Sequence, residues 1–147
     1  MLQGNVNGGF LNVMQIIFIF CGTPASGKTF YSKKMSEEQN AIRLSFDEMR
    51  LFQHKELIPY VIEALQDNQN VVVDALFTRT SQRKLILEAT KDIPCKRILI
   101  YMDTPLEECL RRNAQRPNPL PDFMVRDIYN SIEPPTLDEG WDEILYY

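Results

Sequence analysis

The chain has 147 residues, 44% of them hydrophobic and 24% charged, which is the composition of one ordinary globular domain rather than of a disordered or fibrous protein. Its net charge of -4 argues against broad, sequence-independent binding to duplex nucleic acid. The longest apolar run, residues 16–21, is too short to cross a membrane, and no signal peptide is visible. We therefore expect a cytoplasmic protein with no membrane partner.

After residue 13, short apolar runs alternate with longer amphipathic stretches. Residues 1–13 show little periodicity, so we expect a loose leader there and a single domain over residues 14–147. The apolar runs predict strands over residues 15–21, 41–45, 70–74, 96–102 and 143–147. The stretches between them predict helices near residues 27–38, 47–54, 57–68, 79–91, 105–116 and 121–131. Such alternation is typical of βαβ units, and it predicts an α/β three-layer sandwich with helices on both faces of a five-stranded, mainly parallel sheet.

The stretch after the first predicted strand matches the phosphate-binding pattern G-x-x-x-x-G-K-[ST] at every fixed position. In such loops the glycines let backbone N–H groups turn toward phosphate oxygens, the lysine reaches the β and γ phosphates, and the last hydroxyl ligates Mg²⁺. The pattern predicts a P-loop NTPase fold that binds ATP and Mg²⁺. The residues of this predicted site are Gly22, Thr23, Pro24, Ala25, Ser26, Gly27, Lys28 and Thr29.

A phosphate-binding loop alone leaves the chemistry open, because kinases, switch GTPases and ATPase motors all use one. The guanine-reading pattern Asn-Lys-x-Asp is absent from the sequence. Motor ATPases usually need a longer chain. The length therefore favours a small kinase.

Carboxylates lie at or just past the ends of predicted strands, where open α/β sheets bind ligands. Asp74 closes the third strand and is a candidate Walker B ligand of Mg²⁺, although strands that end in Asp are common. Asp47 and Arg50 form a D-x-x-R pattern at the expected start of a helix. In a kinase such a carboxylate can accept the proton of the attacking hydroxyl, while the arginine holds the acceptor. A helix-terminal Asp beside a surface Arg would give the same spacing.

The segment after the fourth strand predicts a helix with arginines at its far end. Thr104 and the Pro that follows it are typical of a capped helix start. Arg112 and Arg116 lie four residues apart on one helix face, and a proline-rich stretch follows them. A mobile lid that brings guanidinium groups onto the transferring phosphate explains these arginines, and so does a solvated helix end.

The order of these parts resembles the polynucleotide-kinase-like P-loop kinases. The matching segments, in the family's order, are GTPASGKT, SFDEMR, VVVDA, DTPLEECLRRNAQR and EPPTLDEGWDEI. The resemblance implies that Lys28 and Thr29 bind phosphate and Mg²⁺. It also implies that Arg116 is the catalytic lid arginine and that Arg112 is a second lid arginine at the nucleotide.

For the acceptor, the resemblance implies that Asp47 is the general base, that Arg50 contacts the acceptor, and that the acceptor is the 5′-hydroxyl of DNA or RNA. Where relatives commonly have Asp-Ala-Thr-Asn, this chain has DALF at residues 74–77, with two apolar groups in place of polar ones. Phe77 is then either a stacking platform for a base or a core aromatic. A small-molecule kinase and a nucleotide-binding regulatory module stay open as alternatives, and the sequence leaves the oligomeric state open.

Three further features of the sequence have simple structural interpretations. The three cysteines are odd in number and lack C-x-x-C spacing, which indicates free, packed thiols. His54 is the only histidine and has no partner at metal spacing, so we expect it at the surface. Trp141 is expected to anchor the last turn of the chain to the sheet.

Overall fold

The computed structural model describes residues 14–147, and the leader expected over residues 1–13 lies outside this range. Its core is a five-stranded sheet in the order β2-β3-β1-β4-β5, in which every neighbouring pair is parallel. The predicted α/β fold is therefore confirmed. The strands are β1 (Gln15–Gly22), β2 (Ala41–Ser45), β3 (Asn70–Asp74), β4 (Cys95–Met102) and β5 (Glu143–Tyr146).

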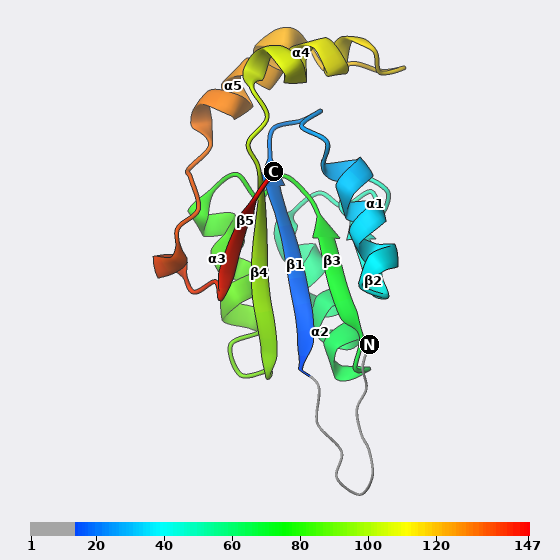
Figure 1. Cartoon of the computed structure of the whole chain (residues 1–147), viewed down its shortest axis with the longest axis vertical. Helices are drawn as coiled ribbons and strands as arrows, with labels where there is room; N and C mark the ends of the chain where they lie inside the picture. The colour runs from blue at the N-terminus through cyan, green and yellow to red at the C-terminus, as the bar shows by residue number, and fades with distance from the viewer. Residues whose placement is uncertain (1–13) are drawn as a thin grey trace, which may run out of the picture.

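Helices pack on the sheet and extend beyond its carboxyl end (Figure 1). Two of them, α4 and α5, lie above that end, and we call these helices and the turn between them the lid, after the role that the sequence predicts. No helix within residues 14–147 is long and apolar enough to span a membrane. The helices are α1 (Lys28–Glu38), α2 (Ile58–Gln66), α3 (Thr80–Ala89), α4 (Leu106–Ala114) and α5 (Asp122–Ser131), with short 3-10 turns η1 (His54–Leu57) and η2 (Leu137–Glu139).

The side chains of the central strands alternate between two buried faces, as the pleat of a strand requires. On one face Ile17 and Ile19 of β1 belong to a large apolar cluster with residues of α2 and α3. On the other face Phe18 and Phe20 belong to a smaller cluster, against which Met35 of α1 packs. Helices thus cover both faces, which is the predicted three-layer arrangement. The three cysteines are free and buried, also as predicted.

The helix predicted over residues 47–54 does not form. Residues 46–50 instead make a turn, in which Arg50 has a φ of 58°. The backbone N–H of Phe46 donates to the carbonyl of Asp74 at 2.9 Å, so the turn is tied to the end of β3. The apolar spacing reflects contact with the core rather than a helical face. The side chains that pack against the core here are Phe46, Met49 and Leu51.

The start of α4 also differs from the prediction. Pro105 occupies the N-cap position, and no side chain caps the helix. The hydroxyl of Thr104 donates instead to the carbonyl of Ser26, at 2.8 Å. The hydroxyl of Thr104, which the sequence predicts to cap the helix, therefore contacts the phosphate-binding loop instead.

Arg83 of α3 is fully buried and joins the C-terminal segment to the core. Its Nε and Nη2 donate to the two carboxylate oxygens of Glu139 at 2.8 and 2.9 Å. Its Nη1 and Nη2 also donate to the carbonyls of Phe77 and Glu133, each at 2.9 Å. The indole N–H of Trp141 donates to Glu139 at 3.0 Å, and its ring packs in the larger cluster, which confirms the predicted anchor. A buried guanidinium needs such pairing because an isolated buried charge is costly.

Replacing Glu139 with Gln should lower the free energy of unfolding by about 3 kcal/mol at pH 7, because it leaves the buried Arg83 charge without a counter-ion. Burial alone would raise the pKa of Glu139, but hydrogen bonds from Arg83 and Trp141 outweigh it and hold the pKa below its usual range. A carboxyl whose pKa is lowered on folding stabilises the protein above its unfolded pKa, and this contribution is lost as the pH falls through the folded pKa. The difference between wild type and Glu139→Gln, measured by urea unfolding, should therefore shrink below about pH 4.

The matched control is Glu88→Gln, which removes an ion-pair carboxylate that is 60% exposed. This control should change the unfolding free energy by less than about 0.5 kcal/mol. Equal losses in the two variants, or a difference that grows in acid, would contradict the role assigned to Arg83.

Candidate active site

The phosphate-binding loop, residues 22–29, closes tightly on the end of the sheet. A Cβ at Gly22 would lie 2.8 Å from Oγ of Ser26 and 2.9 Å from Cβ of Met102, so a side chain has no room there. Gly27 forms the N-cap of α1 with a φ of 106°, a conformation that favours glycine. Both glycines of the predicted pattern thus have a steric reason in the fold.

Lys28 is buried within this loop, with 8% of its surface exposed. Its ammonium donates to the carbonyls of Gly22 and Thr23 at 3.1 and 2.9 Å. Burial lowers the pKa of Lys28 to about 8, an effect that Asp74 opposes and Arg116 reinforces. Phosphate oxygens form stronger, charge-assisted hydrogen bonds than carbonyls do. The ammonium can therefore exchange its carbonyl partners for those of a bound nucleotide.

The lid brings two arginines to the loop. A Cβ at Gly27 would lie 3.3 Å from Nη1 of Arg112, so this guanidinium rests against the loop backbone. Nε of Arg112 donates to Glu108 at 2.7 Å, which holds the side chain from its other side. Arg116 is near enough to Lys28 for its charge to lower the pKa of that ammonium. Arg112 thus lies against the predicted phosphate-binding loop, and Arg116 lies within electrostatic range of Lys28.

Asn113 fixes the shape of the lid between α4 and α5. Its buried amide donates to the carbonyl of Leu120 at 2.7 Å and accepts from the N–H of the same residue at 3.1 Å. This pair closes the proline-rich turn that carries Arg116. The sequence analysis missed Asn113, although an amide just before such a turn is typical of side chains that satisfy loop backbone groups.

Asp74, predicted as a metal ligand, lies opposite Phe20 of β1 at the carboxyl end of β3. Its Oδ2 accepts hydrogen bonds from Oγ of Ser32 at 2.9 Å and from Nη2 of Arg43 at 2.8 Å. Among residues 14–147, no cluster of three or more His, Cys, Asp or Glu side chains could hold a metal by itself. Mg²⁺ commonly binds through one carboxylate and the phosphates of its nucleotide. Asp74 and Thr29, the predicted ligands, carry oxygen atoms of the kind that this mode uses.

The turn over residues 46–50, which we call the acceptor loop after its predicted role, exposes both Asp47 and Arg50 at the carboxyl end of β2. The N–H of Arg50 donates to the carbonyl of Asp47 at 3.1 Å, which closes the turn. The hydrogen bond from Phe46 to Asp74 keeps this turn beside the end of β3. The predicted base and acceptor arginine thus lie at the same edge of the sheet as the phosphate-binding loop, but on a turn rather than at a helix start.

Phe77 is not available to stack on a base. Its side chain is fully buried in the larger core cluster, so the core alternative holds and its assignment to acceptor binding is wrong. The ring of His54 lies 4.8 Å from that of Phe77 and 5.1 Å from that of Phe46. His54 is therefore partly buried between aromatic rings rather than at the surface, and burial lowers its pKa. A histidine followed by an amphipathic helix gives no sequence signal for this packing.

Arg43 and Ser32 were also missed by the sequence analysis. Arg43 lies in the middle of β2, within AIRLS. A charged residue inside a short parallel strand is itself a signal, because it needs a nearby counter-charge when buried. Its partner, Asp74, comes from the neighbouring strand.

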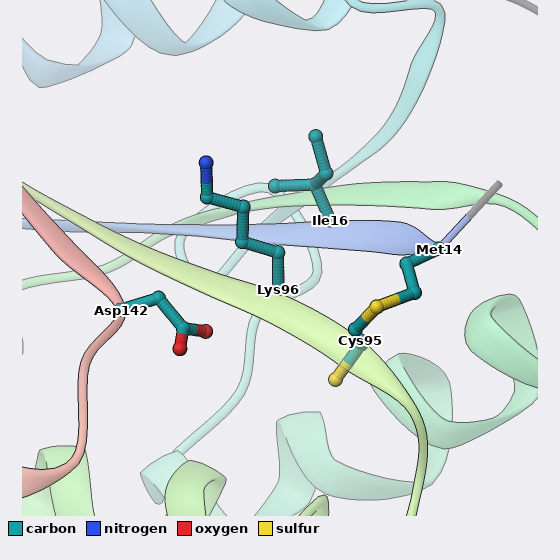
Figure 2. A pocket seen from close by; sticks show the side chains of 5 residues that line it. All are labelled: Met14, Ile16, Cys95, Lys96 and Asp142. Carbon is teal, nitrogen blue, oxygen red and sulfur yellow. The ribbon is translucent and has the colours of Figure 1, made fainter.

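A pocket of about 300 Å³ opens at the opposite edge of the sheet, where β1 and β4 begin (Figure 2). Ligands of open α/β sheets bind at the carboxyl ends of the strands. This pocket lies at the start of β1, whereas the phosphate-binding loop follows the end of the same strand, so the two are separate. Its lining residues are Met14, Ile16, Cys95, Lys96 and Asp142.

One protein family covers most of the chain. The AAA domain family matches residues 17–135, which include the phosphate-binding loop, the acceptor loop and the lid. The chain belongs to this family. The L-seryl-tRNA(Sec) kinase of Methanococcus maripaludis is 29% identical over 144 residues, a match that covers 86% of this chain and 56% of that protein. This AAA domain thus spans about half the length of that relative.

Solved kinase structures share the fold of this AAA domain. The Pnkp1/Rnl/Hen1 RNA repair complex contains a chain with a TM-score of 0.72 at 19% identity, over 82% of this chain and 45% of that one. A sugar kinase from Janibacter sp. HTCC2649 also has a TM-score of 0.72, at 12% identity, over 91% of this chain and 86% of that one. At such identities the likeness shows the fold alone. The domain has the P-loop kinase fold.

Replacing Lys28 with Ala should raise the dissociation constant of MgATP roughly 10- to 100-fold, which is what charge-assisted hydrogen bonds to phosphate usually contribute. Isothermal titration calorimetry measures this constant directly, and circular dichroism shows whether the fold survives. Lys34→Ala, an exposed lysine on the same helix, should bind MgATP as wild type does. A folded Lys28→Ala protein with wild-type affinity would contradict the nucleotide site.

Proposed function

We propose that this protein is an ATP-dependent kinase that transfers the γ-phosphoryl group to a hydroxyl. The observation that carries the proposal is that a glycine-rich loop holds Lys28, while a separate lid places Arg112 against that loop and Arg116 within electrostatic range of Lys28. Phosphoryl transfer depends mainly on positioning and on positive charge around the transferred group. The AAA domain match and the seryl-tRNA(Sec) kinase relative support the same reaction.

The nucleotide side of the reaction uses the loop and the lid. Backbone N–H groups of residues 22–29 and the ammonium of Lys28 bind the phosphates. Arg112 binds the nucleotide from the side of the lid. Arg116 neutralises charge that develops on the γ-phosphoryl group. Thr29 and Asp74 would hold Mg²⁺, which would supply further positive charge at the phosphates.

The acceptor side of the reaction uses the acceptor loop. The acceptor oxygen attacks the γ-phosphorus while its proton passes to the carboxylate of Asp47. The bond between the γ-phosphorus and the bridging oxygen breaks, and ADP leaves with that electron pair. Arg50, exposed beside Asp47, holds the acceptor through a phosphate or another acceptor oxygen.

For the acceptor itself, an RNA-borne hydroxyl is best supported. The Methanococcus relative is by name a kinase of seryl-tRNA, and the motif order resembles polynucleotide kinases, whose acceptor is a 5′-hydroxyl. Both acceptors offer a primary hydroxyl attached to RNA, with phosphates that Arg50 can bind. The burial of Phe77 removes a stacking surface for a terminal base. We therefore rank the hydroxyl of a seryl group on an aminoacylated tRNA as a better candidate acceptor than a polynucleotide 5′-hydroxyl.

A small hydroxyl compound is the second candidate. The net charge of -4 suits an uncharged acceptor, and a sugar kinase shares the fold. A regulatory nucleotide-binding module would keep the phosphate-binding loop but need neither Asp47 nor Arg116.

If Asp47 is the base, Asp47→Asn should lower kcat by about 10² to 10⁴, the usual contribution of a positioned general base. The dissociation constant of MgATP should stay close to wild type, because Asp47 lies on the acceptor loop. Asp92→Asn, an exposed carboxylate in the turn before β4, is the control and should leave both quantities unchanged. A parallel loss of MgATP affinity would assign Asp47 to the metal instead.

A panel of acceptors with γ-labelled ATP and Mg²⁺ tests the acceptor class. The panel holds serine-charged tRNA, the same tRNA uncharged, a 5′-hydroxyl oligonucleotide and simple sugars. We expect label on the charged tRNA. Its KM should rise with salt concentration with a log–log slope of about 2, because about three phosphate contacts on a single strand contribute about 0.7 each. Label on the oligonucleotide or on a sugar would select the corresponding alternative, and release of inorganic phosphate alone would favour the regulatory module.

A further inference from the structure

Arg43 lies between two carboxylates that belong to different parts of the site. Its Nη2 donates to Oδ2 of Asp74 at 2.8 Å, on the nucleotide side. Its Nη1 donates to Oε2 of Glu48 at 2.8 Å, in the acceptor loop. The Arg43 and Asp74 side chains are 12% and 6% exposed, whereas that of Glu48 is 60% exposed. One guanidinium thus spans from the buried end of β3 to the surface turn.

Ser32 of α1 completes the buried half of this arrangement. Nε of Arg43 donates to Oγ of Ser32 at 2.8 Å, and this hydroxyl lies 2.9 Å from Oδ2 of Asp74, to which it donates. Ser32 is fully buried one turn after Thr29, on the helix that starts at the phosphate-binding loop. The planar fork of an arginine makes several such bonds from fixed directions, which a lysine cannot reproduce. Arg43 is therefore held in one orientation relative to the nucleotide side.

Glu48 links Arg43 to the acceptor loop, of which it is a part. It follows Asp47 directly, and its backbone N–H lies 3.3 Å from Oγ of Ser45, to which it donates. Its backbone and its side chain are thus both fixed, the first by β2 and the second by Arg43. A restraint on Glu48 limits the positions open to the neighbouring Asp47.

We propose that Arg43 and Glu48 are positioning residues that tie the acceptor loop to Asp74, so that Asp47 is held at a fixed position relative to the nucleotide. The proposal rests on the proposed function, in which Asp47 takes the acceptor proton. Misplacement of a reacting group by about 1 Å can cost up to 100-fold in rate, so a weak surface ion pair can matter for kcat while contributing little to stability.

The decisive variant is Glu48→Gln, and its matched control is Glu88→Gln, because both remove an ion-pair carboxylate that is 60% exposed. The assay uses γ-labelled ATP and the panel member that accepts most label. Glu48→Gln should lower kcat roughly 10- to 100-fold, leave the melting temperature near wild type, and leave the MgATP dissociation constant within about twofold. Hydrogen exchange of the amides in residues 46–51 should become faster, as expected when a local restraint is lost.

Variants of Arg43 test the nucleotide half of the bridge. Arg43→Met should lower kcat and also change the ratio of ATP dissociation constants with and without Mg²⁺, because it removes the charged hydrogen bond to Oδ2 of Asp74 and leaves only that of Ser32. Glu48→Gln should leave that ratio unchanged. Arg43→Lys keeps the charge but not the fork, so it should not restore kcat. The double variant Arg43→Met with Glu48→Gln should lose less kcat than the product of the single losses, because both remove one bridge.

The possible failures are distinguishable. If no panel member accepts label, or if Asp47→Asn is as active as wild type, the proposed function fails and the bridge has no reaction to serve. If Asp47→Asn is impaired while Glu48→Gln matches Glu88→Gln in kcat and in exchange, the bridge alone is refuted. A Glu48→Gln protein that loses MgATP affinity or melting temperature in step with kcat would make the pair structural and would also overturn the proposal.

Discussion

The site depends on the register of β1 between its two parallel neighbours. Phe20 lies opposite Asp74 of β3, and Gly22 lies opposite Met102 of β4. This pairing starts the phosphate-binding loop beside the end of β3 and beside the strand that leads to the lid. A slip of one residue would turn the Ile face of β1 to the wrong cluster, so burial on both faces fixes the register. The position of the site follows from the packing of the core.

Charge is distributed unevenly around this frame. The chain is acidic overall, with a net charge of -4, yet Lys28, Arg112 and Arg116 gather at the loop. Salt screens exposed charges beyond roughly 10 Å, so distant carboxylates do not cancel this local concentration. Burial of the Lys28 ammonium has a cost, and the same burial lowers its pKa to about 8. A bound polyphosphate would remove that cost, which favours binding.

Three polar side chains that are buried or nearly so join separate segments of the fold. Arg83 joins α3 to Glu139, Arg43 joins β2 to Asp74, and Asn113 closes the turn of the lid. Each makes hydrogen bonds with groups that are largely shielded from water, which such groups need. Two of the three are arginines, since a guanidinium can donate to several acceptors at once. These contacts hold the turns of the molecule, whereas the apolar clusters hold its sheet.

The sequence by itself determined where the five strands lie along the chain, the phosphate-binding loop and the cluster of arginines after the fourth strand. Those features depend on local patterns: apolar runs, glycine spacing and charge at a helix end. The turn at residues 46–50, the burial of Phe77 and His54 and the contact of Thr104 with the loop depend on distant parts of the chain. Only the tertiary structure decided them, because a side chain that has a local hydrogen bond or helical face available takes a distant partner when that contact buries more surface or satisfies a buried polar group.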